Sequence, residues 1–164
     1  MMIPTGRVLR HVAAASSNGE LKTISMPAAP SEKLLIMAFS PTCESCQASQ
    51  PAWKSLAKEL RARLGWRVLW ISRDPIQNTI AYCREQQIPL EDTVADPTYR
   101  TYMQLALKVV PSTVVVGDGG RVEKVWSGRV DEKQWGEISS YFNLRQKELP
   151  ALALDKDSGA VAAK

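Results

Sequence analysis

Apolar residues in the first part of the chain form short runs and helix-spaced stripes. The run 34–39 is apolar throughout and stops at Ser40-Pro41, which is typical of a strand buried on both faces. A second buried strand is predicted over 68–71. Between them lies a stripe with helical spacing that ends before Gly65, formed by Trp53, Leu56, Ala57, Leu60 and Leu64. The pattern predicts a strand–helix–strand unit around one core.

The middle of the chain carries two further helix signals. Asp74-Pro75 predicts an Asp cap with proline at the first helical position, and Ile76, Ile80 and Cys83 then share one helix face. Asp96-Pro97 announces a third helix in the same way, with an apolar stripe that extends to Ala106. We therefore expect two consecutive helices after the second strand.

The last third of the pattern predicts a hairpin and a final helix. Two strands, 113–116 and 122–126, flank the glycine-rich turn 117–120. Asp131 with Gln134 three residues later favours a helix start that buries Trp135, Ile138 and Phe142. The element order predicts an α/β fold with a central mixed sheet flanked by helices.

We predict three segments in the chain. Residues 1–30 show little periodicity and are expected to form an N-terminal extension, with room for extra strands. Residues 31–146 would form the folded domain, and residues 147–164 a flexible tail of small and charged residues.

Composition narrows the classes of protein. The chain has 164 residues, 45% of them apolar, and a net charge of +4, which indicates an ordinary globular domain. No apolar run approaches the roughly 18 residues of a membrane span. The basic residues are interleaved with acidic ones, so nucleic-acid binding has little support.

The chemistry is expected at a pair of cysteines with C-x-x-C spacing. Cys43 and Cys46 follow the first strand at a helix start, where free N–H groups and the helix dipole favour a thiolate. We expect Cys43 to be the nucleophile and Cys46, deeper in the helix, to resolve the mixed disulfide. Cys83 lies on an apolar stripe and is best explained as a small buried hydrophobe. A zinc site is disfavoured because Cys83 and His11 lack ligand-pair spacing, so no metal is predicted.

These features together resemble the thioredoxin superfamily over about residues 34–142. They are the C-x-x-C at a helix start, Pro51 within that helix, and Val110-Pro111-Ser112-Thr113 at the entry to the hairpin. The long stretch between Cys43 and Pro111 resembles the TlpA/redoxin branch, and Phe39-Ser40-Pro41-Thr42-Cys43 is similar to MauD-type relatives. The resemblance implies a thioredoxin-like fold with an inserted helix between the C-x-x-C half and the hairpin half.

The resemblance also implies an activity and further site residues. It implies a protein-disulfide oxidoreductase that needs no cofactor beyond its Cys43–Cys46 disulfide. Pro111 would be a cis-proline facing the cysteine pair, and Val110 would offer its backbone to an extended substrate.

The sequence departs from the thioredoxin pattern around the cysteines. Thr42 stands where thioredoxins usually have tryptophan, and Met37 where they bury an aspartate that handles the proton of the second thiol. In TlpA-like relatives a glutamate can do this work, which makes Glu85 and Glu91 candidate proton acceptors. Glu44, Ser45 and Thr42 are candidate tuning residues, because Glu44 disfavours a Cys43 thiolate while Ser45 can donate a hydrogen bond.

The resemblance further implies a cellular location and a pathway. Such relatives are membrane-anchored reductants in extracytoplasmic maturation, for example of cytochrome c, and act on protein thiols and disulfides with an upstream redox donor. We expect a periplasmic protein if an anchor has been removed, and a cytoplasmic one if Met1 is the native start. Any membrane contact would then need an anchor that this chain does not contain.

Two alternative functions stay open at this stage. One is a peroxiredoxin-like thiol peroxidase, disfavoured because Pro41-Thr42 abut Cys43 instead of preceding it by several residues. The other is a binding module that holds thiols or a metal without turnover.

Overall fold

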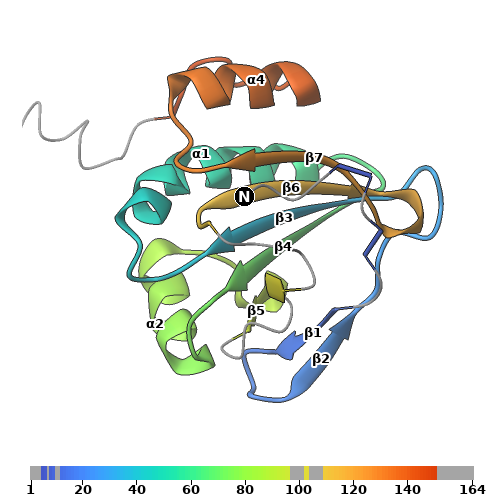
Figure 1. Cartoon of the computed structure of the whole chain (residues 1–164). Helices are drawn as coiled ribbons and strands as arrows, with labels where there is room; N and C mark the ends of the chain where they lie inside the picture. The colour runs from blue at the N-terminus through green and yellow to red at the C-terminus, as the bar shows by residue number, and fades with distance from the viewer. Residues whose placement is uncertain (1–4, 7, 10–11, 97–101, 104–108, 151–164) are drawn as a thin grey trace, which may run out of the picture.

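The computed structural model describes residues 5–6, 8–9, 12–96, 102–103 and 109–150. Within them a seven-stranded sheet has the order β2-β1-β5-β4-β3-β6-β7 (Figure 1). The strands are β1 (Val12–Ala15), β2 (Leu21–Ile24), β3 (Lys33–Phe39), β4 (Trp66–Ser72), β5 (Thr93–Ala95), β6 (Ser112–Gly117) and β7 (Arg121–Ser127). The helices are α1 (Glu44–Arg61), α2 (Ile76–Gln86) and α4 (Glu132–Phe142), with short 3₁₀ turns η1 (Leu90–Asp92) and η2 (Asp118–Gly120).

Strand β3 lies inside the sheet between β4 and β6 and is buried on both faces, as its apolar run predicts. It pairs in parallel with β4 and antiparallel with β6, so that Leu35 is opposite both Val68 and Val115. Because successive strand side chains point to opposite faces, β3 serves two cores. Its odd-numbered residues pack in the core that holds residues of α1, α2 and α4, and its even-numbered residues pack in the core that holds Tyr102 and residues of the N-terminal segment.

The N-terminal segment is part of the sheet. β1 and β2 pair antiparallel, and β1 joins the sheet through Ala15 opposite Ala95 of β5. Backbone hydrogen bonds also tie this segment to the β6–β7 turn, where Gly119 N–H donates to Pro27 and Leu9 N–H donates to Gly120. The weak periodicity of residues 1–30 therefore concealed two short strands.

Helix α1 starts earlier and ends earlier than its apolar stripe predicts. It begins directly after Cys43 and ends at Arg61, so that Leu64 lies in the following turn with its side chain fully exposed. The expectation that Leu64 belongs to the core face is wrong. Gly65 has a φ of +87°, and a side chain there would meet the Ser31 carbonyl oxygen. The turn before β4 therefore requires glycine.

The two predicted helix caps have different outcomes. Asp131 caps α4, because its carboxylate accepts the N–H of Gln134 at 2.8 Å. Asp74 does not cap α2: the N-cap is Pro75, and no side chain caps the helix. The Asp74 carboxylate instead accepts a hydrogen bond from Ser40 at 2.9 Å, beside the loop that leads to Cys43.

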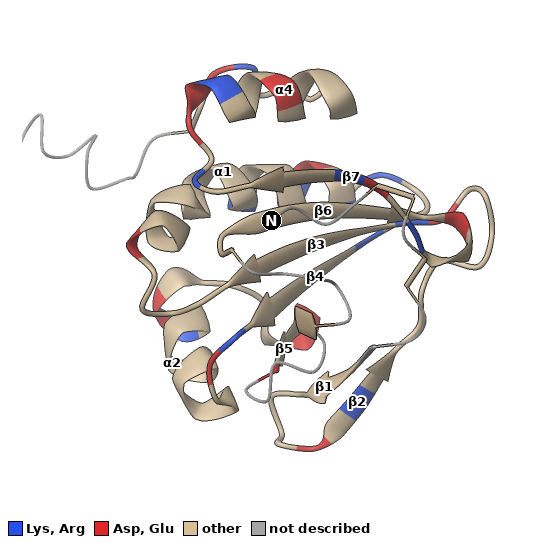
Figure 2. Cartoon of the chain, in the orientation of Figure 1, with Lys and Arg blue, Asp and Glu red and all other residues tan. Residues whose placement is uncertain are grey.

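Some predictions concern residues outside the described ranges. The helix expected from Asp96-Pro97 to Ala106 falls there except for Asp96, Tyr102 and Met103, as do His11 and the tail from residue 151 onward. Where the structure is described, no helix is long and apolar enough to cross a membrane. In the same ranges, positive and negative residues alternate over the ribbon without forming a stripe of one sign (Figure 2).

Candidate active site

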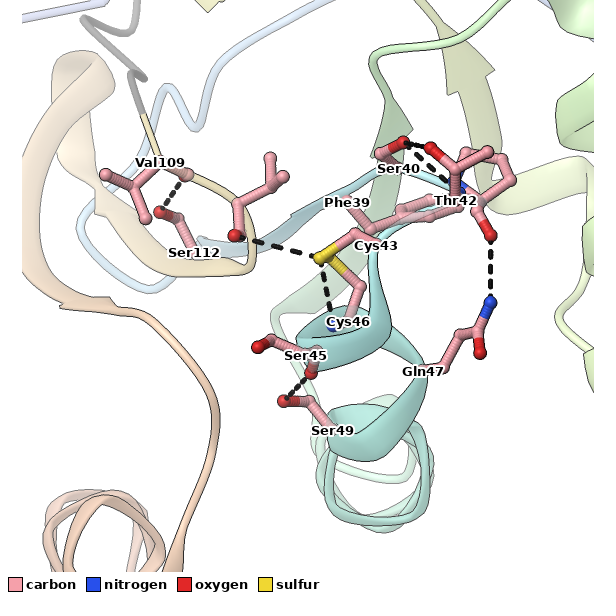
Figure 3. The surroundings of a disulfide bond; sticks show 12 residues. Phe39, Ser40, Thr42, Cys43, Ser45, Cys46, Gln47, Ser49, Val109 and Ser112 are labelled. Carbon is pink, nitrogen blue, oxygen red and sulfur yellow. Dashed lines mark hydrogen bonds between the residues drawn. A yellow bond between two sulfur atoms is a disulfide. The ribbon is translucent and has the colours of Figure 1, made fainter.

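Cys43 is placed by the junction between β3 and α1. It is the N-cap of α1, with φ −91° and ψ 114°, and its sulfur accepts the N–H of Cys46 at 3.1 Å (Figure 3). The backbone N–H groups of a helix start have no intrahelical partner, so they are available to a sulfur at this position. An N–H donor at this distance stabilises a Cys43 thiolate when the pair is reduced.

The two cysteines form a disulfide and differ in accessibility. Cys43 and Cys46 are bonded to each other. The Cys46 side chain is 0% exposed, whereas Cys43 is partly exposed at the helix start. Of the two sulfurs, only that of Cys43 belongs to a residue that is accessible from the surface.

The loop before β6 runs past the disulfide. The Val110–Pro111 peptide bond is cis. The Val110 carbonyl oxygen lies 3.8 Å from Cys43 Sγ, and the Ser112 hydroxyl donates to the Val109 carbonyl at 2.7 Å (Figure 3). The Pro111 carbonyl accepts the N–H of Gly128 at 2.8 Å, so the β7–α4 loop supports this segment.

A hydrogen-bonded network holds the loop on the other side of Cys43. The Ser40 hydroxyl is buried, lies 3.1 Å from the Thr42 hydroxyl and accepts the Thr42 N–H. Because the same hydroxyl donates to Asp74, the loop after β4 is fixed to the approach to Cys43. Thr42, Glu44 and Ser45 are themselves exposed around the cysteine.

The two predicted proton acceptors, Glu85 and Glu91, lie on different elements of the fold. Glu85 is exposed on α2, and its charge acts on Tyr82 one turn earlier. Glu91 is exposed in η1, next to Asp92, which pairs with Arg61 at the end of α1. Cys46 and Arg61 are fifteen residues apart on one helix, or about 22 Å at about 1.5 Å per residue. Glu91 is thus too distant to take a proton directly from Cys46.

Cys83 is not part of the disulfide site. Its side chain is 0% exposed, and its sulfur lies 3.8 Å from the Thr93 hydroxyl. Burial raises the pKa of the Cys83 thiol, although the contact with Thr93 acts in the opposite direction. This is a buried, unreactive thiol, as its position on the apolar stripe predicts. Among the described residues no group of three His, Cys, Asp or Glu side chains is arranged to hold a metal.

The structure adds buried polar residues that the sequence interpretation did not identify. Ser49 and Gln50 are 0% and 1% exposed and follow Cys46 by three and four residues on α1. The Ser49 hydroxyl donates to the Ser45 carbonyl at 2.8 Å and accepts the N–H of Val130 at 2.9 Å. The sequence did contain a signal for their burial, because both residues occupy positions that continue the apolar stripe of the helix toward Cys46.

Solved structures confirm the predicted thioredoxin-like fold. A candidate protein disulfide isomerase of Bacteroides thetaiotaomicron aligns with a TM-score of 0.71 at 13% identity, over 99% of this chain and 96% of that one. A candidate thiol:disulfide interchange protein DsbE of Chlorobium tepidum gives 0.68 at 15%, over 86% and 97%. StoA of Bacillus subtilis gives 0.60 at 13%, over 80% and 98%.

The fold and the site define a class of redox protein, one in which a C-x-x-C disulfide caps a helix beside a cis-proline loop. The chain belongs to the AhpC/TSA family, whose model matches residues 8–125. No curated protein sequence matches it.

Proposed function

We propose that the protein is a thiol–disulfide oxidoreductase that exchanges its Cys43–Cys46 pair with protein substrates. The observation that carries this proposal is the position of Cys43 Sγ, which is 3.1 Å from a helix-start N–H donor and partly exposed. A thiolate stabilised in this way attacks a substrate disulfide, and Cys46 then displaces the substrate sulfur from Cys43. No cofactor takes part in this exchange.

Val110 and Pro111 are the proposed substrate-docking residues. Their loop passes within 3.8 Å of Cys43 Sγ and is held by the Gly128 N–H. An extended substrate segment can pair with the Val110 backbone as an added strand does, which brings its sulfur to Cys43. Thr42, Glu44 and Ser45 surround the same sulfur and are proposed to tune its reactivity, and Glu85 is the better placed of the two proposed proton acceptors.

Trapping of the mixed disulfide tests the proposal. Reduced Cys46→Ser should attack a peptide disulfide through Cys43, release one peptide thiol and accumulate the mixed disulfide, and reduced Cys43→Ser should not, because only the first variant keeps the nucleophile while losing the resolving thiol. If neither variant forms a complex that dithiothreitol reverses, the proposal fails. Rapid hydroperoxide consumption by Cys46→Ser, with an external thiol present, would instead support a thiol peroxidase.

We further propose that the pair works as a reductant in an extracytoplasmic maturation pathway, such as that of cytochrome c. The support is the resemblance to TlpA- and MauD-like proteins. Equilibration against glutathione and dithiothreitol buffers should give a reduction potential near about −250 mV or lower, whereas a value near about −120 mV would make the pair an oxidant. Fractionation of the native cells should place the protein outside the cytoplasm, and recovery only in the cytosolic fraction would contradict the setting.

A further inference from the structure

Two buried polar side chains without ordinary hydrogen-bond partners lie on α1 and α2. Gln50 on α1 is 1% exposed and Tyr82 on α2 is 6% exposed. Neither the Gln50 amide nor the Tyr82 hydroxyl completes a hydrogen bond of normal geometry with any described residue. The two groups nevertheless face each other closely enough for Gln50 to influence the ionisation of Tyr82. Buried polar groups are nearly always hydrogen-bonded, so this exception points to a role.

Gln50 and Cys46 share the buried face of α1. They are four residues apart, which places their Cβ atoms about 5–6 Å from each other. Long helical side chains lean toward the helix N-terminus, so the Gln50 side chain is directed toward the turn of α1 that carries Cys46. Ser49 is not available for the same purpose, because its hydroxyl already bonds to Ser45 and Val130.

Tyr82 reaches the same region from α2. Its ring stacks on Phe39 with 5.4 Å between the centroids, and both rings belong to the core cluster that contains Cys46. Burial raises the pKa of Tyr82 to about 12, so its hydroxyl remains a proton donor in the physiological range. The Gln50 amide is likewise a donor through its NH₂ group.

We propose that Gln50 and Tyr82 are positioning residues that donate hydrogen bonds to the Cys46 sulfur when it becomes a thiolate. This inference rests on the proposed exchange function and adds residues to it. Cys46 is fully buried, so water does not solvate its charged form. Two buried donors whose one indicated polar neighbour is each other are therefore suited to stabilise it.

The step in which the donors act can be written with its atoms balanced. In the mixed disulfide, Cys46 Sγ forms a bond to Cys43 Sγ as the bond from Cys43 Sγ to the substrate sulfur breaks. The electron pair leaves on the substrate sulfur, and the proton lost by Cys46 is balanced by the one that this sulfur takes up. In the reverse reaction Cys46 is the leaving group, so the same donors act in both directions.

Other groups that can ionise near the pair are few among the described residues. On α2 they are Cys83, which is buried, and Arg84 and Glu85, which are exposed. On and before α1 they are Cys43, exposed Glu44, and Lys54, which is partly buried and donates to the Gln86 carbonyl of α2 at 2.9 Å. No described residue of β3 adds a charge to this part of the core, because Leu34 to Phe39 are all apolar.

The two sulfur reactions can be followed separately with a chromogenic aromatic disulfide. The reduced protein should release one chromophore when Cys43 attacks and a second when Cys46 resolves the mixed disulfide. In Gln50→Leu and Tyr82→Phe we expect the second phase to slow by about tenfold at neutral pH, with the first phase unchanged. Gln77→Leu and Tyr141→Phe, at exposed sites on α2 and α4, are matched controls and should leave both phases unchanged.

A second readout excludes a merely structural effect. In a Cys43→Ser background, thiolate absorbance measures the pKa of Cys46, which should rise when Gln50 or Tyr82 loses its donor. The inference is overturned if both variants keep the second phase within about twofold and leave that pKa unchanged. The exchange function itself fails separately, if the unmodified protein releases only the first chromophore and forms no Cys43–Cys46 disulfide.

Discussion

Replacing Ser49 by alanine should both destabilise the protein and loosen the substrate-docking loop. The Ser49 hydroxyl is the acceptor for the buried N–H of Val130, a residue that is 2% exposed, so the loss of this acceptor leaves a buried donor unpaired. The loop that contains Val130 also supplies the Gly128 N–H that holds the Pro111 carbonyl. One hydroxyl therefore connects α1 to the segment that faces Cys43.

The expected magnitude follows from the bond that is lost. Leaving a buried N–H without an acceptor costs about 1–3 kcal/mol. Alanine is a better helix former than serine, which offsets about 0.5 kcal/mol of this loss. Ser140→Ala, at an exposed position of α4, has the same gain in helix propensity but leaves no buried N–H without an acceptor. The two variants should thus differ by about 2 kcal/mol in the free energy of unfolding.

Denaturant unfolding followed by circular dichroism measures this difference. In thermal unfolding, about 2 kcal/mol corresponds to a difference of about 4–8 °C in Tm for a domain of this size. Exchange with a peptide disulfide should also slow in Ser49→Ala, since the docking loop is less well held. Equal stability of Ser49→Ala and Ser140→Ala would refute the assignment of Ser49 as the acceptor that holds the loop.

Three further predictions follow from groups that are buried or ionisable. Thr113→Val should lower the unfolding free energy by about 1–3 kcal/mol, because the Trp53 indole N–H donates to the Thr113 hydroxyl at 2.8 Å in the core; an unchanged denaturant midpoint would contradict this. Glu59 accepts the backbone N–H groups of residues 145–146, and although burial opposes ionisation, these bonds hold its pKa below the ordinary 4.5. Its stabilising effect should be complete above about pH 4.5 and disappear as the pH falls through the folded-state pKa, so the stability difference from Glu59→Gln should shrink on acidification; a difference independent of pH would argue against it. Cys83 should resist alkylation in the native protein and react on unfolding, because burial raises the pKa of its thiol; rapid native labelling, read by mass spectrometry, would count against a buried role.

The sequence was informative where one local pattern decides the structure. An uninterrupted apolar run can only be a fully buried element, which is how β3 appears in the structure. Four tryptophans within the predicted strands and on the predicted apolar helix faces are all at most 4% exposed: Trp53, Trp70, Trp126 and Trp135. The C-x-x-C position between a strand and a helix likewise followed from local order alone, and the structure places Cys43 at the helix N-cap.

Features that depend on tertiary partners were not predictable in the same way. Leu64 continues the helical stripe, but α1 ends at Arg61 because the chain must turn back to begin β4. Asp74 has the residue type and position of a cap, but its carboxylate bonds to Ser40 of another loop. Gln50 is buried, as its place on the continued apolar stripe allows, but its neighbour Tyr82 comes from α2, which the sequence does not show.

The Cys43 and Cys46 sulfurs have different surroundings, so side-chain substitutions affect the reactivity of the two cysteines unequally. Cys43 is contacted by backbone groups, the Cys46 N–H and the Val110 carbonyl, which persist whatever side chains stand nearby. Glu44 is exposed, so solvent and salt screen its effect on Cys43. Around buried Cys46 screening is weak, and one polar side chain changes the stability of a thiolate far more. Substitutions at Gln50 should therefore alter exchange more than substitutions at Glu44, although Glu44 is adjacent to the nucleophile.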